Sequence, residues 1–201
     1  MFIKLFVLGR PGCGKSKTAK HITKFIEPEG WVTYRFKDYD ILEMMFKKDV
    51  SQKRFRPCEQ GGFDVLDVSA FDEALNTLER DIDEYILNIK DNTFIVIEFA
   101  RDNYEQAFKQ FSPAFLQDAH FLLVDTALET CKQRIIERTA HPDTPDDHFI
   151  SDYALNTYYH GQYLPGDTII MERFVMVENQ SSWQEFTEKI NTFIKNILET
   201  L

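Results

Sequence analysis

The sequence predicts an α/β fold: a three-layer, doubly wound parallel sheet of five strands with helices on both faces. Short runs of β-branched and aromatic residues alternate along the chain with segments whose apolar residues recur every three or four positions. The run at 93–98 is apolar at consecutive positions, which is typical of a central parallel strand covered on both faces. Because no repeat or linker interrupts the alternation, we expect a single domain over residues 1–201.

Each expected element has a local signal for its beginning or its end. The first strand ends at Gly9, and the helix after it stops before Pro28. Patterns of the type Ser/Thr-x-x-Asp/Glu predict capped helices at Ser69, Thr126 and Ser182. The expected strands cover residues 2–8, 31–36, 93–98, 120–125 and 173–178. The expected helices cover residues 15–25, 41–48, 69–89, 103–111, 126–138, 147–160 and 182–201, and residues 51–68 are expected to be irregular.

Composition excludes several classes of protein. Hydrophobic residues make up 43% and charged residues 28% of the 201 residues, which is typical of globular domains and not of disordered, collagenous or coiled-coil chains. The net charge of −10 disfavours a general binder of nucleic acid or of an anionic membrane. The cysteines lie far apart, and no apolar run reaches the roughly 18 residues of a membrane span. We therefore expect a cytoplasmic protein; its oligomeric state stays open, with a homodimer as one alternative.

Positive charge is concentrated at the start of the chain. The first 26 residues carry six cations and no anion, whereas the whole chain has 33 acidic and 23 basic residues. Two interpretations stay open. The bias is either chance over a short segment, or it marks an end of the chain that binds a polyanion.

A phosphate-binding motif follows the first strand. The segment Gly9-Arg-Pro-Gly-Cys-Gly-Lys-Ser16 matches GxxxxGK[ST] and lies between an expected strand and an expected helix, the context that the motif requires. The glycines let successive N–H groups point at a phosphate, and the helix N-terminus adds partial positive charge. In such a loop Lys15 reaches the β- and γ-phosphates, and the hydroxyl of Ser16 ligates Mg²⁺. The sequence therefore predicts a site for ATP or another nucleoside triphosphate.

The residues of the motif, together with the residue that follows it, are expected to bind the nucleotide. They are Gly9, Arg10, Pro11, Gly12, Cys13, Gly14, Lys15, Ser16 and Lys17. Cys13 lies at the start of the expected helix, a position that lowers the pKa of a thiol. We therefore expect Cys13 to be reactive.

With this motif, the sequence resembles the small-molecule kinase branch of the P-loop NTPases, which holds nucleoside monophosphate kinases, deoxynucleoside kinases and shikimate kinase. The order of the expected elements is similar nearly end to end, although only residues 9–16 are highly specific. The resemblance implies the strand order 2-3-1-4-5, an acceptor pocket behind the second and third strands, and an arginine-bearing lid after the fourth. It also implies an ATP- and Mg²⁺-dependent kinase for a small molecule, with nucleosides or nucleotides as the expected acceptors.

Two pairs of charged residues fall where the resemblance places the acceptor. Asp38 and Asp40 follow the second strand and resemble the acidic pair of shikimate-kinase-like enzymes, in which a carboxylate accepts a proton or holds the acceptor; helix capping is the other interpretation. Glu98 ends the third strand, where a buried carboxylate needs a cation or Mg²⁺. Arg101 follows at a spacing found in neither monophosphate kinases nor deoxynucleoside kinases. Whether the first pair or Glu98 supplies the base is left open.

A third pair, Arg134 and Arg138, lies one helical turn apart before the polar segment 139–165, which we expect to be the lid. Both arginines can point at a transferring phosphoryl group, or they can pair with the dipole at the helix end. The alternative function is a nucleotide-dependent switch or regulatory ATPase, which does not need these groups. The residues expected in catalysis are Lys15, Asp38, Asp40, Glu98, Arg101, Arg134 and Arg138, and those expected at the metal are Ser16 and Glu98.

Overall fold

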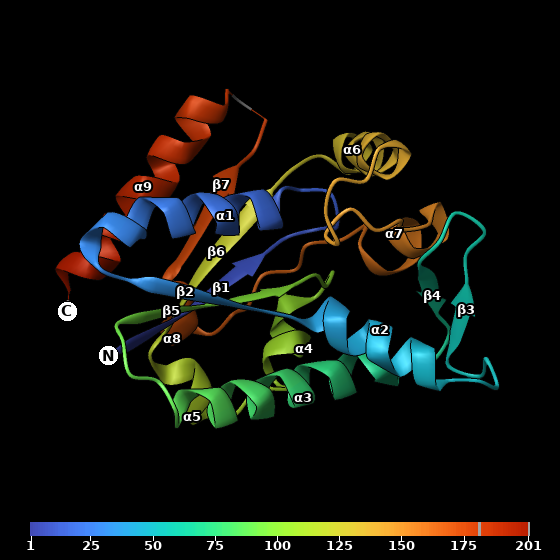
Figure 1. Cartoon of the computed structure of the whole chain (residues 1–201), viewed down its shortest axis with the longest axis horizontal. Helices are drawn as coiled ribbons and strands as arrows, with labels where there is room; N and C mark the ends of the chain where they lie inside the picture. Colours follow the sequence, from blue (N-terminus) through green and yellow to red (C-terminus); the bar gives the residue numbers. More distant parts are fainter. Residues whose placement is uncertain (181, 201) are drawn as a thin grey trace.

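The computed structural model describes residues 1–180 and 182–200, and its centre is a parallel sheet with helices on both faces (Figure 1). The strands of this sheet are β1 (Phe2–Leu8), β2 (Val32–Lys37), β5 (Thr93–Phe99), β6 (Ala119–Asp125) and β7 (Phe174–Glu178). The helices are α1 (Lys15–Ile26), α2 (Asp38–Lys48), α3 (Ser69–Ile86), α4 (Tyr104–Phe108), α5 (Pro113–Gln117), α6 (Leu128–Ala140), α7 (Asp152–Tyr158), α8 (Thr168–Met171) and α9 (Trp183–Glu199), with a 3₁₀ turn at Glu27–Glu29. Within the described residues, no helix has both the length and the apolar character to cross a membrane.

The order of the sheet is β2-β5-β1-β6-β7, and all neighbouring strands are parallel. Counted along the chain, these five strands have the order 2-3-1-4-5, so the predicted fold class is confirmed. β1 lies in the middle of the sheet. The loop after β1 therefore emerges where the strand order reverses, the position at which open α/β sheets bind ligands.

Each face of the sheet buries its own apolar cluster. Residues of β1 alternate between the faces: Leu5 and Val7 pack with α1 and α9, whereas Phe6 and Leu8 pack with α3, α4 and α5 (Figure 1). The ring of Phe6 lies at the centre of the second cluster. Its centroid is 5.1 to 6.2 Å from the centroids of Phe99, Phe108, Phe111, Phe115 and Phe121.

Two of the three predicted helix caps are wrong, because the N-cap residue is a neighbour of the predicted one: Val68 for α3 and Ala127 for α6. α6 begins without a side-chain cap, and the hydroxyl of Thr126 instead donates to the carbonyl oxygen of Cys13 at 3.2 Å. α3 begins at Ser69 itself, whose hydroxyl donates to the Asp67 carboxylate at 2.7 Å. The third prediction is confirmed, since the Ser182 side chain caps α9.

Several elements differ in extent from the prediction, and residues 51–68 and 147–160 are two examples. Residues 51–68 are not wholly irregular, because β3 (Phe55–Pro57) and β4 (Phe63–Val65) form an antiparallel hairpin there. The helix expected over 147–160 is limited to α7, since the side chain of Ser151 caps it and residues 141–151 form a loop. Leu201, the expected end of the last helix, lies outside the described residues.

The Phe6→Ala substitution is expected to lower the free energy of unfolding by about 3–5 kcal/mol, because it leaves a cavity among five aromatic rings. Urea unfolding followed by circular dichroism measures the change. Phe2→Ala in the same strand is the matched control: this side chain is 41% exposed, and its loss should cost less than about 1 kcal/mol. Similar losses for both variants would contradict the central position of Phe6.

Candidate active site

A cavity of about 360 Å³ lies where the carboxyl ends of β1, β2 and β5 meet. It is lined by the P-loop (residues 9–16), the start of α2, one side of α6 and the loop 141–151. Segments far apart in the sequence thus meet in one place. The predicted site residues that line the cavity are Pro11, Gly12, Gly14, Lys15, Ser16, Lys17, Asp38, Glu98, Arg134 and Arg138.

The P-loop backbone requires glycine at three positions. Gly9, Gly12 and Gly14 have φ values of 135°, 82° and 111°, which other residues rarely adopt. Space is also restricted. A Cβ atom at Gly9 would lie 2.4 Å from the carbonyl oxygen of Val124, and one at Gly12 would lie 2.5 Å from that of Cys131. The glycines therefore let the loop approach β6 and α6 closely.

The carbonyl oxygen of Cys13 connects the P-loop to three other elements. It accepts hydrogen bonds from the hydroxyl of Thr126 at 3.2 Å, the side-chain amide of Asn179 at 2.8 Å and the guanidinium of Arg134 at 3.4 Å. The donors come from the ends of β6 and β7 and from α6. These bonds hold the curled loop in place from outside.

Two other P-loop side chains face the protein rather than the cavity. Arg10 donates to the carbonyl oxygens of Tyr159 at 2.7 Å and His160 at 3.0 Å, which connects the loop to the segment after α7. The Cys13 side chain is fully buried, and this burial raises the pKa of its thiol. The prediction of a reactive Cys13 is therefore wrong, because desolvation outweighs the effect of the helix N-terminus.

Lys15, Ser16 and Glu98 form the part of the site nearest the P-loop. The ammonium group of Lys15 donates to two P-loop carbonyl oxygens at 2.7 and 3.0 Å. The Ser16 hydroxyl donates to the carboxylate of Glu98 at 3.3 Å, and Glu98 is only 3% exposed. One hydroxyl and one carboxylate oxygen at this separation fit Mg²⁺, which takes its remaining ligands from phosphate and water.

Asp38 and Arg101 form a buried ion pair, with 2.6 Å between Oδ2 and Nη1. Arg101 also donates to the carbonyl oxygen of Phe71 at 2.9 Å, which fixes its guanidinium. Burial raises the pKa of Asp38, and Arg101 opposes that shift. Asp38 lines the cavity and Arg101 holds it from behind. Asp40, in contrast, is exposed and pairs with Lys37 at 3.0 Å, outside the cavity lining.

Arg134 and Arg138 both line the cavity from α6, so the two side chains share one helix face as the spacing predicts. Arg138 donates to the carbonyl oxygen of His148 at 2.9 Å, which connects α6 to the loop 141–151. Its Nε atom is buried and has no hydrogen-bond partner among the described residues. Arg138 therefore has an unused donor close to the cavity.

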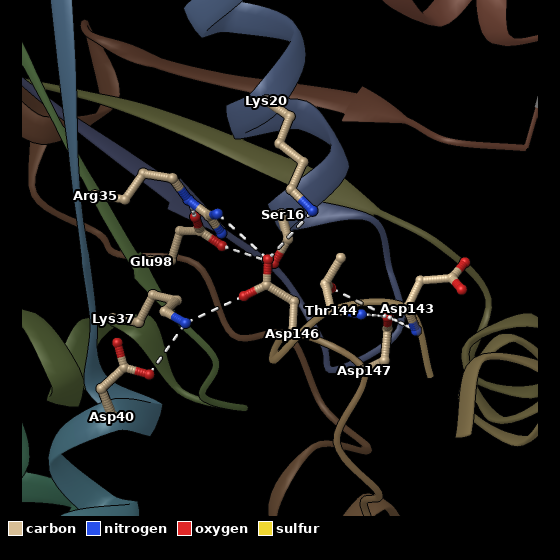
Figure 2. Close-up of polar contacts among 10 residues, drawn as sticks. All are labelled: Ser16, Lys20, Arg35, Lys37, Asp40, Glu98, Asp143, Thr144, Asp146 and Asp147. Atoms are coloured by element: carbon tan, nitrogen blue, oxygen red, sulfur yellow. Dashed lines mark hydrogen bonds and ion pairs between the residues drawn. The ribbon is translucent and has the colours of Figure 1, made fainter. Parts of the chain in front are cut away.

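Asp146, the charged residue at the centre of Figure 2, is a site residue that no sequence pattern predicted. Its carboxylate lies 3.5 Å from the ammonium group of Lys20, 3.3 Å from the guanidinium of Arg35 and 3.1 Å from the ammonium group of Lys37. Arg35 also contacts Glu98 at 2.7 Å. Arg35 and Lys37 are two residues apart on β2 and so share a face of the strand. The sequence shows this spacing and could have indicated the pair. Asp146 lies in a loop without any pattern.

The loop 141–151 lines the cavity, and contacts in its C-terminal part hold it to other elements. The His148 ring stacks on the Tyr39 ring with 3.5 Å between centroids and an interplanar angle of 10°. Ser151, which caps α7, donates to Asp64 of the β3–β4 hairpin. The predicted lid segment therefore contacts both α2 and the hairpin.

Comparison with known proteins finds no matching family model and no matching curated sequence. Solved structures do match, over nearly the whole chain. An APS kinase from Mycobacterium tuberculosis has a TM-score of 0.58 and 15% identity, with 96% of this chain and 97% of that chain covered. A gluconokinase from Sinorhizobium meliloti 1021 has a TM-score of 0.57 and 16% identity, with 98% and 94% covered. This chain has the fold of the P-loop small-molecule kinases.

A shikimate kinase from Acinetobacter baumannii is similar at a TM-score of 0.51 and 10% identity, with 100% of this chain and 95% of that chain covered. The predicted resemblance to the P-loop small-molecule kinase branch is therefore confirmed for the fold. Each of these kinases extends over nearly the same length as this chain.

Asp146→Asn is expected to reduce stability at pH 7 by about 2 kcal/mol. Partial burial opposes ionisation, but Arg35 and Lys37 together lower the pKa of Asp146 from 3.8 to about 2. A carboxyl group whose pKa is lower in the folded state adds stability above its unfolded pKa and loses it as the pH falls through the folded value. The difference between variant and wild type should therefore shrink as the pH falls from about 4 towards 2.

Urea unfolding at a series of pH values measures this difference. Asp143→Asn removes the same charge from an exposed position in the same loop and should have little effect at any pH. A loss for Asp146→Asn that is equal at pH 7 and near pH 2 would contradict the ion pairs.

Proposed function

We propose that this protein is a Mg²⁺-dependent kinase that transfers the γ-phosphoryl group of ATP to a hydroxyl group of a small molecule. The observation that carries the proposal is the shared cavity: the P-loop and a buried carboxylate, Asp38, line the same space. A nucleotide switch needs only the first of these. The structures with this fold include a shikimate kinase in complex with shikimate and an APS kinase in complex with AMPPNP and APS.

On the donor side, the P-loop amides and Lys15 would bind the phosphates of ATP. Lys15 would exchange its two carbonyl partners for β- and γ-phosphate oxygens. Ser16 and Glu98 would hold Mg²⁺, which when bound offsets the negative charge of these phosphates. Glu98 suits this role better than that of a base, because its carboxylate already lies beside the Ser16 hydroxyl.

On the acceptor side, Asp38 is the proposed base. As the acceptor oxygen attacks the γ-phosphorus and the bond to the β-phosphate oxygen breaks, the hydroxyl proton would pass to the Asp38 carboxylate, and ADP would leave. Burial makes Asp38 a stronger base than an exposed aspartate. Arg101 would be a positioning residue, since its guanidinium fixes the carboxylate without lining the cavity.

The lid side would supply positive charge and exclude water. Arg134 and Arg138 line the cavity from one side of α6, where they could stabilise charge on the phosphoryl oxygens during transfer. The loop 141–151 would exclude water that competes with the acceptor. Nucleosides and nucleotides are the first acceptors to test, because the sequence resembles kinases for these molecules. A screen for ADP release should include sugars and hydroxylated acids as well.

Lys15→Ala is expected to weaken ATP binding by at least about tenfold, because the substitution removes a charge that contacts the phosphates. Its effect on the melting temperature should be small, since Lys15 holds only P-loop carbonyls. Calorimetric titration with ATP and Mg²⁺ measures the affinity. Lys24→Ala, at an exposed position of the same helix, is the matched control. Equal ATP affinity in wild type and Lys15→Ala would refute the nucleotide site.

Asp38→Asn is expected to lower kcat by about 100-fold or more while ATP binding is retained, because the variant loses the proposed base. Glu98→Gln should instead raise the Mg²⁺ concentration needed for half-maximal rate. ADP release measured over a range of Mg²⁺ separates the two effects. A larger loss for Asp40→Asn than for Asp38→Asn would assign the base to Asp40. Wild-type rates in both Asp38→Asn and Glu98→Gln would favour a protein without an acceptor.

A further inference from the structure

Three cations converge on one carboxylate beside the proposed reaction centre. Lys20 comes from α1, whereas Arg35 and Lys37 come from β2, and all three lie within 3.5 Å of Asp146 (Figure 2). We call Lys20, Arg35 and Lys37 the cation cluster. Asp146 reaches it from the loop 141–151, so the carboxylate and the cations belong to separate parts of the fold.

The cation cluster can donate more hydrogen bonds than Asp146 accepts. Nη2 of Arg35 is buried and has no hydrogen-bond partner among the described residues. The cavity as a whole is lined by six lysines or arginines and four aspartates or glutamates. Lys15, Arg134 and Arg138 have proposed roles at the ATP phosphates, but Lys20 and Lys37 have none there. A buried donor without a partner and a surplus of positive charge are typical of a site for an anion.

The cluster also lies between the two halves of the proposed chemistry. On one side, Arg35 contacts Glu98, which contacts Ser16. On the other side, Lys37 lines the same cavity as Asp38, the proposed base. A molecule held by the cluster would therefore lie close to both the metal ligands and the base. This is the position that a phosphoryl acceptor must occupy.

We propose that Lys20, Arg35 and Lys37 bind an oxyanion group of the acceptor, a phosphate or a carboxylate, which displaces Asp146 from them. This inference rests on the proposed kinase function and narrows its acceptor to acidic molecules. Asp146 fills the oxyanion position in the structure described here and thereby holds the loop 141–151 closed. The side chain can leave without unfolding an element, since the loop has no helix or strand.

Anion binding to the complete chain tests the proposal directly. The protein is first saturated with AMPPNP and Mg²⁺, so that the P-loop and the γ-phosphate position are filled. Inorganic phosphate and malonate are then titrated in separate calorimetric experiments. Asp146→Asn should bind at least one of the two anions about tenfold more tightly than wild type, because the competing carboxylate is gone. Lys20→Gln and Lys37→Gln should each weaken binding by about tenfold.

Three controls make the result specific. Asp143→Asn removes a charge from the same loop, and Lys47→Gln removes an exposed charge from α2; neither should change anion affinity. The double variant Asp146→Asn/Lys37→Gln should lose the gain made by Asp146→Asn alone. A gain that persists in the double variant would place the anion elsewhere and overturn the proposal. So would equal affinities in wild type, Asp146→Asn and Lys37→Gln.

The same titrations separate this inference from the proposed function. If AMPPNP does not bind, the kinase proposal itself fails. If AMPPNP binds and the anion affinities do not respond to these variants, only the cation cluster is wrongly assigned. In the ADP-release screen, kcat/KM should be about tenfold or more higher for the acidic member of a matched pair, such as a nucleoside monophosphate and its nucleoside. Lys37→Gln should reduce that preference, whereas a preference for neutral acceptors would overturn the proposal.

Discussion

The ion pair between Glu98 and Arg35 is the interaction on which the rest of the site depends. Glu98 is the penultimate residue of β5 and is 3% exposed, so its charge would cost several kcal/mol without a partner. Arg35 supplies that partner at 2.7 Å from the neighbouring edge strand. The same guanidinium also contacts Asp146, and the second carboxylate oxygen of Glu98 lies beside the Ser16 hydroxyl. One arginine thus connects the P-loop side of the cavity to the loop 141–151.

The sequence predicts what depends on neighbours along the chain and misses what depends on contacts across the fold. The alternation of expected strands and helices predicts the sheet, and the GxxxxGK[ST] motif predicts the phosphate-binding loop after β1. Asp38 and Glu98 line one cavity because parallel strands bring their carboxyl ends to the same edge. The helix cap predicted at Thr126 is wrong because Ala127 is the N-cap residue of α6, and the Thr126 hydroxyl donates instead to a carbonyl far along the chain. The role of Asp146 is not predicted because its partners on α1 and β2 are far from it in the sequence and meet it only in the folded chain.

Few positions of the chain are restricted to particular residue types, which explains how the fold can match solved structures at 10–16% identity while no family model matches. The P-loop needs glycines at positive φ and a few donors to hold it. Those donors are one side chain just after β6, one just after β7 and one within α6, and all three donate to the carbonyl oxygen of Cys13. Only a few positions in the chain serve this purpose. The apolar positions that build the two cores can change freely in identity while their volume and pattern are kept.

The charge distribution also has a physical consequence for an acidic ligand. The chain carries a net charge of −10, yet Lys15, Lys17 and Lys20 of the cationic first segment line the cavity. The net charge repels an anion at long range, and at physiological salt charges more than about 8 Å away are largely screened. An anion must therefore gain its binding free energy inside the cavity, from direct contact with cations. Asp146 already makes such contacts. An acidic ligand therefore has to compete with a carboxylate of the same chain, which is present at high effective concentration.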